Sequence, residues 1–264
     1  MPICHHYYLP SISPPSQTMT PSSVLITGAN RGIGLGFVHH FLSLPDVKHV
    51  FAATREPETA EDLQKISDSR LHIIKMDVRS DESIVAAEKE VSSILGAAGL
   101  NLLINNAGVT TVYDIDAAPC RESILSVLDA NVAGPIVVAQ VFLPLLRAAS
   151  SALNSLPVSI SRAAIVNISS GRGSIQDNTS GGKIVYRTSK TALNSLTKTL
   201  SFHTTKDGIL TVAILPGYVV TRMTGNKGSL TVEQSVKLMA DSLEKFGEEH
   251  QGGFFGKNGE PYAY

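Results

Sequence analysis

The stretch Ser23-Val-Leu-Ile-Thr-Gly28-Ala-Asn-Arg-Gly32-Ile-Gly34 decides the fold. It begins with a short apolar run, which suits a strand buried inside a parallel sheet. The part from Gly28 follows the pattern G-x-x-x-G-x-G, and apolar residues at helical spacing then continue to Leu44, before Pro45 ends the predicted helix. Strand, glycine-rich turn and helix in this order are typical of a dinucleotide site, because glycines let the backbone approach a pyrophosphate at the helix N-terminus.

Apolar runs of the same kind recur along the chain and alternate with helical segments. Further strands are predicted at residues 49–53, 71–76, 101–105, 163–168 and 209–214, and a seventh is proposed at Phe254-Phe255. Helices are predicted at 57–67, after the N-cap residue Ser80, at 121–150, around Tyr186 and at 231–246. This alternation predicts an α/β fold in three layers, built on a doubly wound parallel sheet of about seven strands, the Rossmann fold.

Composition and charge limit the possible classes of function. The chain has 264 residues, 43% of them hydrophobic and 17% charged, with a formal net charge of -1. No long run of like charge indicates a nucleic-acid or anionic-membrane surface. We expect no membrane-spanning stretch and no secretory signal. The prolines, serines and threonines of residues 1–21 predict a disordered extension. The lack of a composition break predicts a single domain over residues 22–264.

Cysteine and histidine usage argues against disulfides and metals. Cys4 and Cys120 are the two cysteines, and Cys4 sits in the polar N-terminal stretch, so we expect a reducing, cytoplasmic location. The pairs His5-His6 and His39-His40 have no nearby cysteine or acidic residue at ligand spacing. No metal site is therefore expected.

Unusual residues follow the ends of six predicted strands. In an open α/β sheet, ligands bind outside the carboxyl ends of the strands, so these residues should meet on one rim. They are Gly28, Arg55, Asp77, Asn105, Ser170 and Pro216. Their convergence indicates a binding site more strongly than any single motif.

The end of the second strand should decide between the two nicotinamide cofactors. An acidic residue there would accept a hydrogen bond from a ribose 2′-OH and repel a 2′-phosphate. The chain has Arg55 instead, which could pair with that phosphate together with Arg31. Arg55 could also pair with Glu56 or Glu58 in solvent. We expect NADP(H) to be preferred over NAD(H).

Two further positions have open interpretations. Asp77 could accept a hydrogen bond from an adenine amino group while Val78 packs on the ring, or it could simply be a turn or cap residue. Asn131 lies within Asn131-Val-Ala-Gly-Pro135, inside the long predicted helix. Because Asn, Gly and Pro are poor helix-interior residues, a kink is expected there, serving either function or packing.

Tyr186 and Lys190 are the candidates for proton transfer. Spaced four residues apart, they lie on one helix face, about 6 Å apart along the axis. An amine beside the phenol would lower its pKa by about two units, to near 8. The alternative is a solvated helix face. A serine hydrolase is not indicated, because Ser169 and Ser170 lack the G-x-S-x-G nucleophile pattern.

Together these residues resemble the short-chain dehydrogenase/reductase family over about residues 22–264. The motifs are Thr27-Gly-Ala-Asn-Arg-Gly-Ile-Gly34, Asn105-Asn-Ala-Gly108, Asn131, Ser170, Tyr186-x-x-x-Lys190 and Pro216-Gly217 through Thr221. The stretch Gly173-Ser-Ile-Gln-Asp-Asn-Thr-Ser-Gly-Gly182 and the closing Gly252-Gly-Phe…Gly259 resemble the Sniffer and C-factor branch of carbonyl reductases. The long spacing from Ser170 to Tyr186 is typical of that branch.

The resemblance implies a catalytic tetrad of Asn131, Ser170, Tyr186 and Lys190. Tyr186 would be the general acid or base, Lys190 would lower its pKa and bind the nicotinamide ribose, and Ser170 would polarise the carbonyl. Asn131 would hold a water that relays protons. The residues expected to bind the cofactor are Gly28, Asn30, Arg31, Gly32, Ile33, Gly34, Arg55, Asp77, Val78, Asn105, Ala107, Gly108, Tyr186, Lys190, Pro216, Gly217, Val219 and Thr221.

The resemblance implies an NADPH-dependent reductase of aldehydes or ketones, or the reverse alcohol dehydrogenase, acting on a small molecule. The polar segment from Arg222 to Ser229 should form a substrate lid. A homodimer through the helix at 121–150 and the Tyr186 helix is a family expectation, although the enlarged loop before Tyr186 could block it. The alternative function is an NADP-binding signalling protein with incidental catalysis.

Overall fold

The computed structural model describes residues 20–264. Apart from its last two residues, the extension predicted at 1–21 lies outside the described residues. One sheet of seven parallel strands organises the chain, in the order β3-β2-β1-β4-β5-β6-β7. The strands are β1 (Ser23–Thr27), β2 (His49–Thr54), β3 (Leu71–Lys75), β4 (Leu102–Asn105), β5 (Ala164–Ile168), β6 (Leu210–Ile214) and β7 (Phe254–Phe255). The predicted doubly wound parallel sheet is thus confirmed, including its seventh strand.

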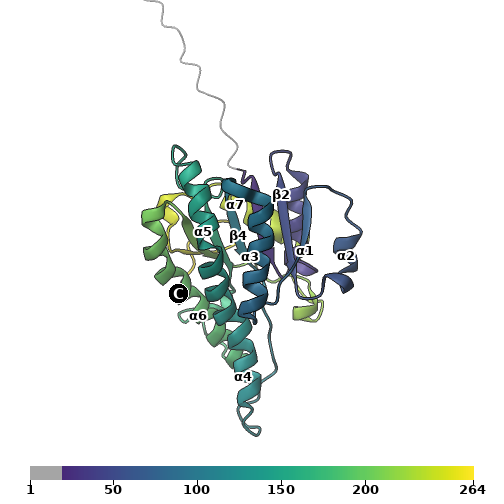
Figure 1. Ribbon diagram of the computed structural model, residues 1–264. Coiled ribbons are helices and arrows are strands. Elements are labelled where there is room, and N and C mark those ends of the chain that lie inside the picture. The colour runs from purple at the N-terminus through teal and green to yellow at the C-terminus, as the bar shows by residue number, and fades with distance from the viewer. Residues whose placement is uncertain (1–19) are drawn as a thin grey trace, which may run out of the picture.

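Helices cover both faces of the sheet (Figure 1). They are α1 (Gly32–Ser43), α2 (Glu61–Gln64), α3 (Asp81–Leu95), α4 (Arg121–Leu128), α5 (Gly134–Ala152), α6 (Ile184–Thr204) and α7 (Val232–Leu243). Side chains of β1 alternate between two cores, because successive residues of a strand point to opposite faces. Ile26 packs in the cluster that contains Phe37 of α1, whereas Leu25 packs in the cluster that contains Phe142 of α5.

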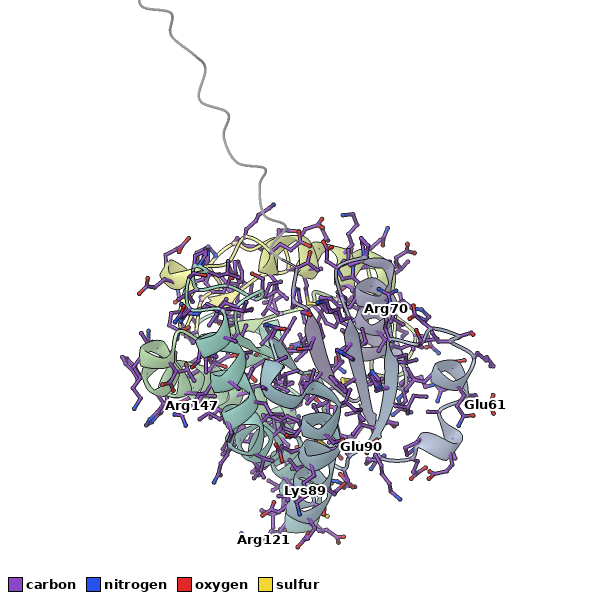
Figure 2. All side chains as sticks on the ribbon, turned by 45° about the horizontal axis from the view of Figure 1, so that its top comes forward. Glu61, Arg70, Lys89, Glu90, Arg121 and Arg147 are labelled. Atoms are coloured by element: carbon purple, nitrogen blue, oxygen red, sulfur yellow. The ribbon has the colours of Figure 1, made fainter. Side chains whose placement is uncertain are left out.

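Charged side chains lie on the outside of these layers. Figure 2 labels Glu61, Lys89, Glu90, Arg121 and Arg147, all of which are exposed. Arg147 of α5 pairs with Asp207, with 2.7 Å between Nε and Oδ2.

The segment predicted as one helix at 57–67 is broken. A 3₁₀ turn at Pro57–Thr59 and the short α2 are separated by Ala60, whose backbone angles (φ -84°, ψ 58°) are not helical. The prediction was wrong because the segment has little apolar surface to bury: only Ala60 and Leu63 are buried within it. The cap at Ser80 is confirmed, since its Oγ accepts from the amide of Ser83 at 3.2 Å.

The long helix predicted at 121–150 is interrupted where a kink was expected. A π turn at Asp129–Ala133 joins α4 to α5, so Asn131 lies in an irregular backbone segment. The continuous stretch Arg121–Ala152 is long and apolar enough to span a membrane by length and composition, contrary to our expectation. Its apolar residues have a second explanation, because Val138, Phe142 and other side chains of α5 are buried against the sheet.

Candidate active site

The turn between β1 and α1 is packed too closely for a side chain at Gly28 or Gly34. Gly28 (φ +64°) and Gly32 (φ +55°) adopt left-handed conformations that favour glycine. A Cβ on Gly34 would lie 2.3 Å from the carbonyl oxygen of Gly28. The N-cap residue of α1, Arg31, makes no side-chain capping bond, so the first-turn amides of α1 can face an anion. This cradle fits the pyrophosphate of a dinucleotide.

A second strand end holds the turn in place. Asn106, which follows β4, donates from Nδ2 to the carbonyl oxygens of Thr27 (2.9 Å) and Gly28 (3.1 Å). Ala107 lies so close that a Cβ on Gly28 would sit 3.0 Å from its Cα. Our list of site residues missed Asn106, although its place in the motif Asn105-Asn-Ala-Gly108 could have indicated it. The hydrogen bonds from Asn106 thus hold the glycine turn against the end of β4.

Two arginines carry positive charge near these strand ends: Arg55 follows β2, and Arg31 is the N-cap residue of α1. Arg55 and Arg31 are exposed, and neither forms an ion pair with any residue in the described part of the chain. The alternative pairing of Arg55 with Glu56 or Glu58 is thus not found. The preceding residues Ala53 and Thr54 are buried and uncharged. The residues at this strand end fit a 2′-phosphate.

Asp77 is a turn residue here. Its Oδ1 accepts from the amide of Arg79 at 3.0 Å, and the Arg79 guanidinium lies 3.5 Å away. Val78 packs near Gly134, whose Cβ position would lie 3.2 Å from Val78 Cγ2. These contacts match the turn interpretation of Asp77. Contact of either residue with an adenine ring stays a prediction.

Asn131 is fully buried and joins three elements. Its Nδ2 donates to the carbonyl oxygen of Val109 (2.9 Å) and to Ser189 Oγ on α6 (3.0 Å), and its Oδ1 accepts from the Val109 amide (2.8 Å). A Cβ on Gly108 would lie 3.2 Å from Asn131 Oδ1 and 3.7 Å from Lys190 Nζ. The structure therefore shows a packing role for Asn131, next to Lys190. Its part in a water relay stays a prediction.

Lys190 is buried on α6 and points to the end of β5. Its Nζ donates to the carbonyl oxygen of Ile168 at 2.8 Å and lies 5.9 Å from the centroid of the Tyr186 ring. Burial lowers the pKa of Lys190 to about 8. The amine therefore lies over the Tyr186 ring, held by the Ile168 carbonyl oxygen.

The pKa of Tyr186 moves in the direction opposite to our prediction. Burial raises the pKa of the phenol, and a hydrogen bond with the Ser170 side chain lowers it by less. The expected fall to near 8 is wrong for the protein's own residues, because removing a phenolate from water costs more than its hydrogen bond returns. The phenol is thus a protonated donor at neutral pH.

Of the two adjacent serines, Ser170 faces the phenol. It caps a 3₁₀ turn at Gly171–Gly173, where its Oγ accepts from the amide of Arg172 at 3.1 Å. Ser169 is buried and donates to Asn194 Oδ1 on α6. The choice of Ser170 over Ser169 agrees with this geometry. The resemblance to the family had favoured Ser170, because Gly173 follows it at the spacing x-x-Gly.

The segment after β6 closes the rim against the glycine turn. A Cβ on Gly32 would lie 3.7 Å from Thr221 Cγ2, so the first and sixth strand ends meet. Gly217 has φ +81°. Val219 forms a bridge with Leu230, which closes the base of the predicted lid between them. The lid starts with a 3₁₀ turn at Arg222–Thr224, capped by Thr221.

Residues near position 260 also reach this rim, which sequence reasoning missed. The Tyr262 hydroxyl lies 3.2 Å from the Cβ position of Gly171, and it hydrogen-bonds the Asp177 side chain. The carbonyl oxygen of Tyr264 accepts from the amide of Gln176 at 2.9 Å. No local pattern links segments so far apart in the chain.

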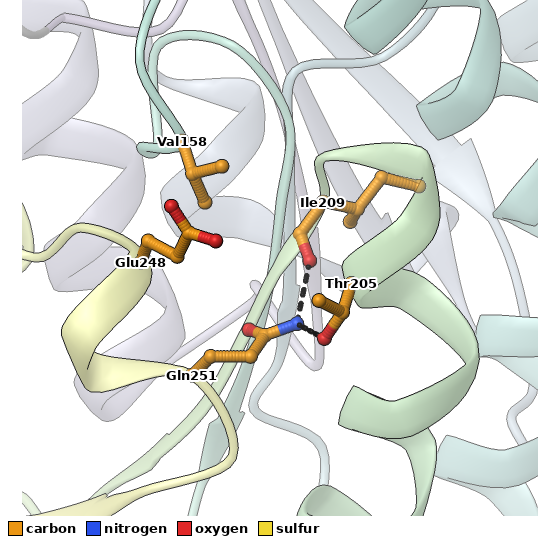
Figure 3. A pocket seen from close by; sticks show the side chains of 5 residues that line it. All are labelled: Val158, Thr205, Ile209, Glu248 and Gln251. Carbon is orange, nitrogen blue, oxygen red and sulfur yellow. Dashed lines mark hydrogen bonds between the residues drawn. The ribbon is translucent and has the colours of Figure 1, made fainter.

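A small recess lies away from this rim. A recess at the opposite end of β6 has a volume of about 10 Å³, room for about one water. Figure 3 shows Gln251 across it, donating to the carbonyl oxygen of Ile209 (3.1 Å) and to Thr205 Oγ1 (3.0 Å). Within residues 20–264 no three His, Cys, Asp or Glu side chains gather as a metal site would require.

The fold and this rim define a nicotinamide-type oxidoreductase, and the comparisons agree. The family model described as short chain dehydrogenase matches residues 22–230. The chain belongs to the short-chain dehydrogenase family and is an NAD(P)-dependent dehydrogenase or reductase.

Among solved structures, it is similar to the carbonyl reductase Sniffer of Drosophila melanogaster, with 40% identity, a TM-score of 0.89 and coverage of 92% of this chain and 100% of that one. An NADPH-bound carbonyl reductase from chicken fatty liver has 40% identity, a TM-score of 0.87 and coverage of 92% and 99%. Among curated proteins, the short-chain dehydrogenase anuI of Penicillium roqueforti is 34% identical over 232 residues, which cover 83% of this chain and 87% of anuI. The predicted resemblance to Sniffer-type carbonyl reductases is confirmed.

Proposed function

We propose that this protein reduces an aldehyde or ketone with NADPH, or oxidises the corresponding alcohol, and that Tyr186 is its general acid or base. The observation that carries the proposal is the Tyr186 phenol hydrogen-bonded to Ser170, with the buried Lys190 amine over its ring. These groups share one rim with the glycine turn. The names of the similar carbonyl reductases support the same class of reaction.

The proposed reduction needs a proton at the carbonyl oxygen and a hydride at the carbonyl carbon. The cofactor supplies the hydride when bound. Tyr186 donates its phenol proton to the oxygen, which becomes the alcohol, while Ser170 donates a hydrogen bond that orients the carbonyl. Because burial raises the pKa of Tyr186, the phenol is in the protonated form that reduction requires at neutral pH.

Lys190 would connect the acid to the cofactor. Its Nζ lies near both Gly108 and the Tyr186 ring, at the place where β4 and β5 end. With a pKa of about 8, the amine is largely protonated at neutral pH. It can therefore stabilise the phenolate left after proton transfer and donate to ribose hydroxyls.

The adjacent serines provide a matched test of this chemistry. Ser170→Ala should lower kcat for a carbonyl panel by about 100-fold or more, because it removes the group that orients the carbonyl beside Tyr186. Ser169→Ala should change kcat little, since Ser169 faces Asn194. Tyr186→Phe should lose at least about 100-fold with unchanged NADPH affinity. Full turnover by Tyr186→Phe, or no turnover by wild type, would defeat the proposal.

Preference for NADP(H) is proposed from the charges after β2. Arg55 and Arg31 have no counter-charge among the described residues, and no acidic side chain ends β2. NADPH should therefore have a lower Michaelis constant than NADH, and Arg55→Glu should raise the constant for NADPH more than for NADH. A lower constant for NADH in the wild type contradicts this preference.

Other predictions remain proposals. A cytoplasmic location fits the free, exposed Cys120. A homodimer through α4, α5 and α6 is expected, and light scattering would measure the molar mass of the assembly in solution.

The alternative function is that of a signalling protein with incidental catalysis. It predicts that Tyr186→Phe keeps the cellular phenotype while mutants of the glycine turn lose it.

A further inference from the structure

We propose that Arg172 and Arg187 form a subsite for the carboxylate of the carbonyl substrate, on the loop between Ser170 and Tyr186. This inference rests on the proposed function and deepens it by naming a substrate class, carbonyl compounds that also carry an anionic group. It rests on a pair of guanidinium groups that share one neutral oxygen and have no acidic partner among residues 20–264.

Arg187 is unusual because it is a buried cation without a carboxylate. It follows Tyr186 in the first turn of α6 and is 8% exposed. Its Nε donates to the carbonyl oxygens of Gly181 (3.0 Å) and Gly182 (3.1 Å), and its Nη2 donates to Ser180 Oγ (3.1 Å). All its partners are neutral, so its charge is not compensated.

Arg172 brings a second positive charge to the same oxygen. Its Nη1 donates to Ser180 Oγ, also at 3.1 Å, and its own amide donates to Ser170 Oγ. Burial lowers the pKa of Arg187, and the neighbouring Arg172 charge lowers it further. Two positively charged groups thus donate to the same neutral acceptor, Ser180 Oγ.

The surrounding loop gives the two arginines no negatively charged partner. Neither arginine forms an ion pair with any of the residues that the structure describes. Asp177 is the acidic residue of the loop, and its carboxylate accepts a hydrogen bond from the Tyr262 hydroxyl instead. Lys183, exposed at the N-cap of α6, adds a third positive charge. The local field therefore favours a bound anion.

The chemistry of the two side chains selects an oxyanion. A guanidinium presents its donors as a planar fork that matches a carboxylate or phosphate. Ser180 Oγ occupies the position that an anionic oxygen would take, and Ser180 is exposed. Gly181 and Gly182 have no atoms within 4 Å of their Cβ positions, so the hydroxyl can move aside without disturbing the core.

The chain itself places this subsite beside the reacting groups. The backbone amide of Arg172 donates to Ser170 Oγ, while its guanidinium donates to Ser180 Oγ, both at 3.1 Å. An anion held by the Arg172 guanidinium is therefore one arginine side chain away from Ser170, which hydrogen-bonds the Tyr186 phenol. A free phosphate ion has the same chemistry, and the experiment separates the two sources.

The test compares two aldehydes that differ in one charge, 4-carboxybenzaldehyde and its methyl ester, with NADPH. Arg172→Gln should raise KM for the carboxylate about tenfold, the loss expected for one charge-assisted hydrogen bond, and leave the ester nearly unchanged. Ser180→Ala should leave or improve KM for the carboxylate, because it removes the competing hydroxyl. Arg121→Gln, which changes an exposed arginine on α4, is the matched control and should alter neither.

Three outcomes overturn the inference. Equal losses for both aldehydes in Arg172→Gln would show that the arginine only supports the loop, and no loss for either would show that it does not bind substrate. Inorganic phosphate that inhibits through Arg172, with no preference for the carboxylate over the ester in wild type, would assign the site to free phosphate instead.

A binding measurement separates this inference from the proposed function. Benzoate should bind wild-type protein saturated with NADP⁺ in a calorimetric titration, and Arg172→Gln should weaken that binding about tenfold. If no aldehyde is reduced but this binding is found, the proposed function fails and the anion site stands. If the ester is reduced and benzoate does not bind, the anion site fails alone.

Discussion

Two parts of the rim differ in how much freedom their backbone has. In the phosphate half, defined as residues 27–34 and 105–108, glycines lie against backbone: a Cβ on Gly34 would be 2.3 Å from the Gly28 oxygen. In the loop half, defined as residues 174–183 and 260–264, the Cβ positions of Gly181 and Gly182 meet nothing within 4 Å. The first half accepts one conformation, and the second is held by a few polar contacts.

This difference separates the parts that bind cofactor from the parts that select substrate. The phosphate half packs against the buried strand ends of β1 and β4, so a change there disturbs fold and cofactor together. Within the loop half, the residues from Ile175 to Lys183 are exposed. Changes there should alter substrate preference and leave the core intact.

The largest expected effect breaks the phosphate half. Gly34→Ala places a methyl group against the Gly28 carbonyl and 3.0 Å from Ala29 Cα, so the turn must open. We expect a loss of at least about 3 kcal/mol in the free energy of unfolding, and loss of NADPH binding. Urea unfolding and NADPH fluorescence titration measure both. If Gly34→Ala had the same free energy of unfolding as wild type, the phosphate half would not be limited to one conformation.

The next effect tests Lys190, whose amine lies near Gly108 of the phosphate half. Its pKa is lowered by burial from 10.5 to about 8, so between these pH values the unfolded chain binds more protons than the folded one. Stability should therefore rise with pH through this window, by up to about 3 kcal/mol, relative to Lys190→Met. Urea unfolding of both proteins at several pH values measures the difference. Parallel curves would show that the amine is not desolvated.

A smaller effect is expected from Gly181→Ala in the loop half. The added methyl group meets no atom, but φ at this position is +58°, a left-handed conformation that costs alanine about 1 kcal/mol. NADPH affinity should be unchanged. Thermal unfolding of Gly181→Ala beside Gly34→Ala gives a direct comparison of the two halves, and equal losses would refute the difference between them.

The smallest effect concerns the hydroxyl of Tyr262. Tyr262→Phe removes its hydrogen bond to Asp177 but keeps the ring packed on Phe254, so about 0.5 kcal/mol should be lost. Hydrogen exchange of the Gln176 amide should become faster, because the loop loses the hydrogen bond between Tyr262 and Asp177. Tyr264→Phe is the control, because its hydroxyl donates to the Gly252 carbonyl oxygen rather than to the loop. Faster exchange in both variants would argue against a specific Tyr262 contact.

Sequence patterns predicted the fold well and the site in part. The strands were found because a buried parallel strand is a short apolar run, and this is a local property. The helix predicted at 57–67 was wrong because little of it is buried, which depends on the tertiary fold. The direction of the Tyr186 pKa was wrong for the same reason: spacing places Lys190 on the same face, but burial decides the energy.

By itself, the sequence determined the parallel sheet, the glycine turn and the rim where Gly28, Ser170 and Tyr186 meet. These follow from periodicity, from glycine's freedom at positive φ and from the rule that parallel strands end on one side. Only the tertiary structure decided that Asn131 joins Val109 to Ser189 and that Arg172 and Arg187 share Ser180. Side-chain partners and desolvation arise from residues distant in the chain, so no local pattern carries them.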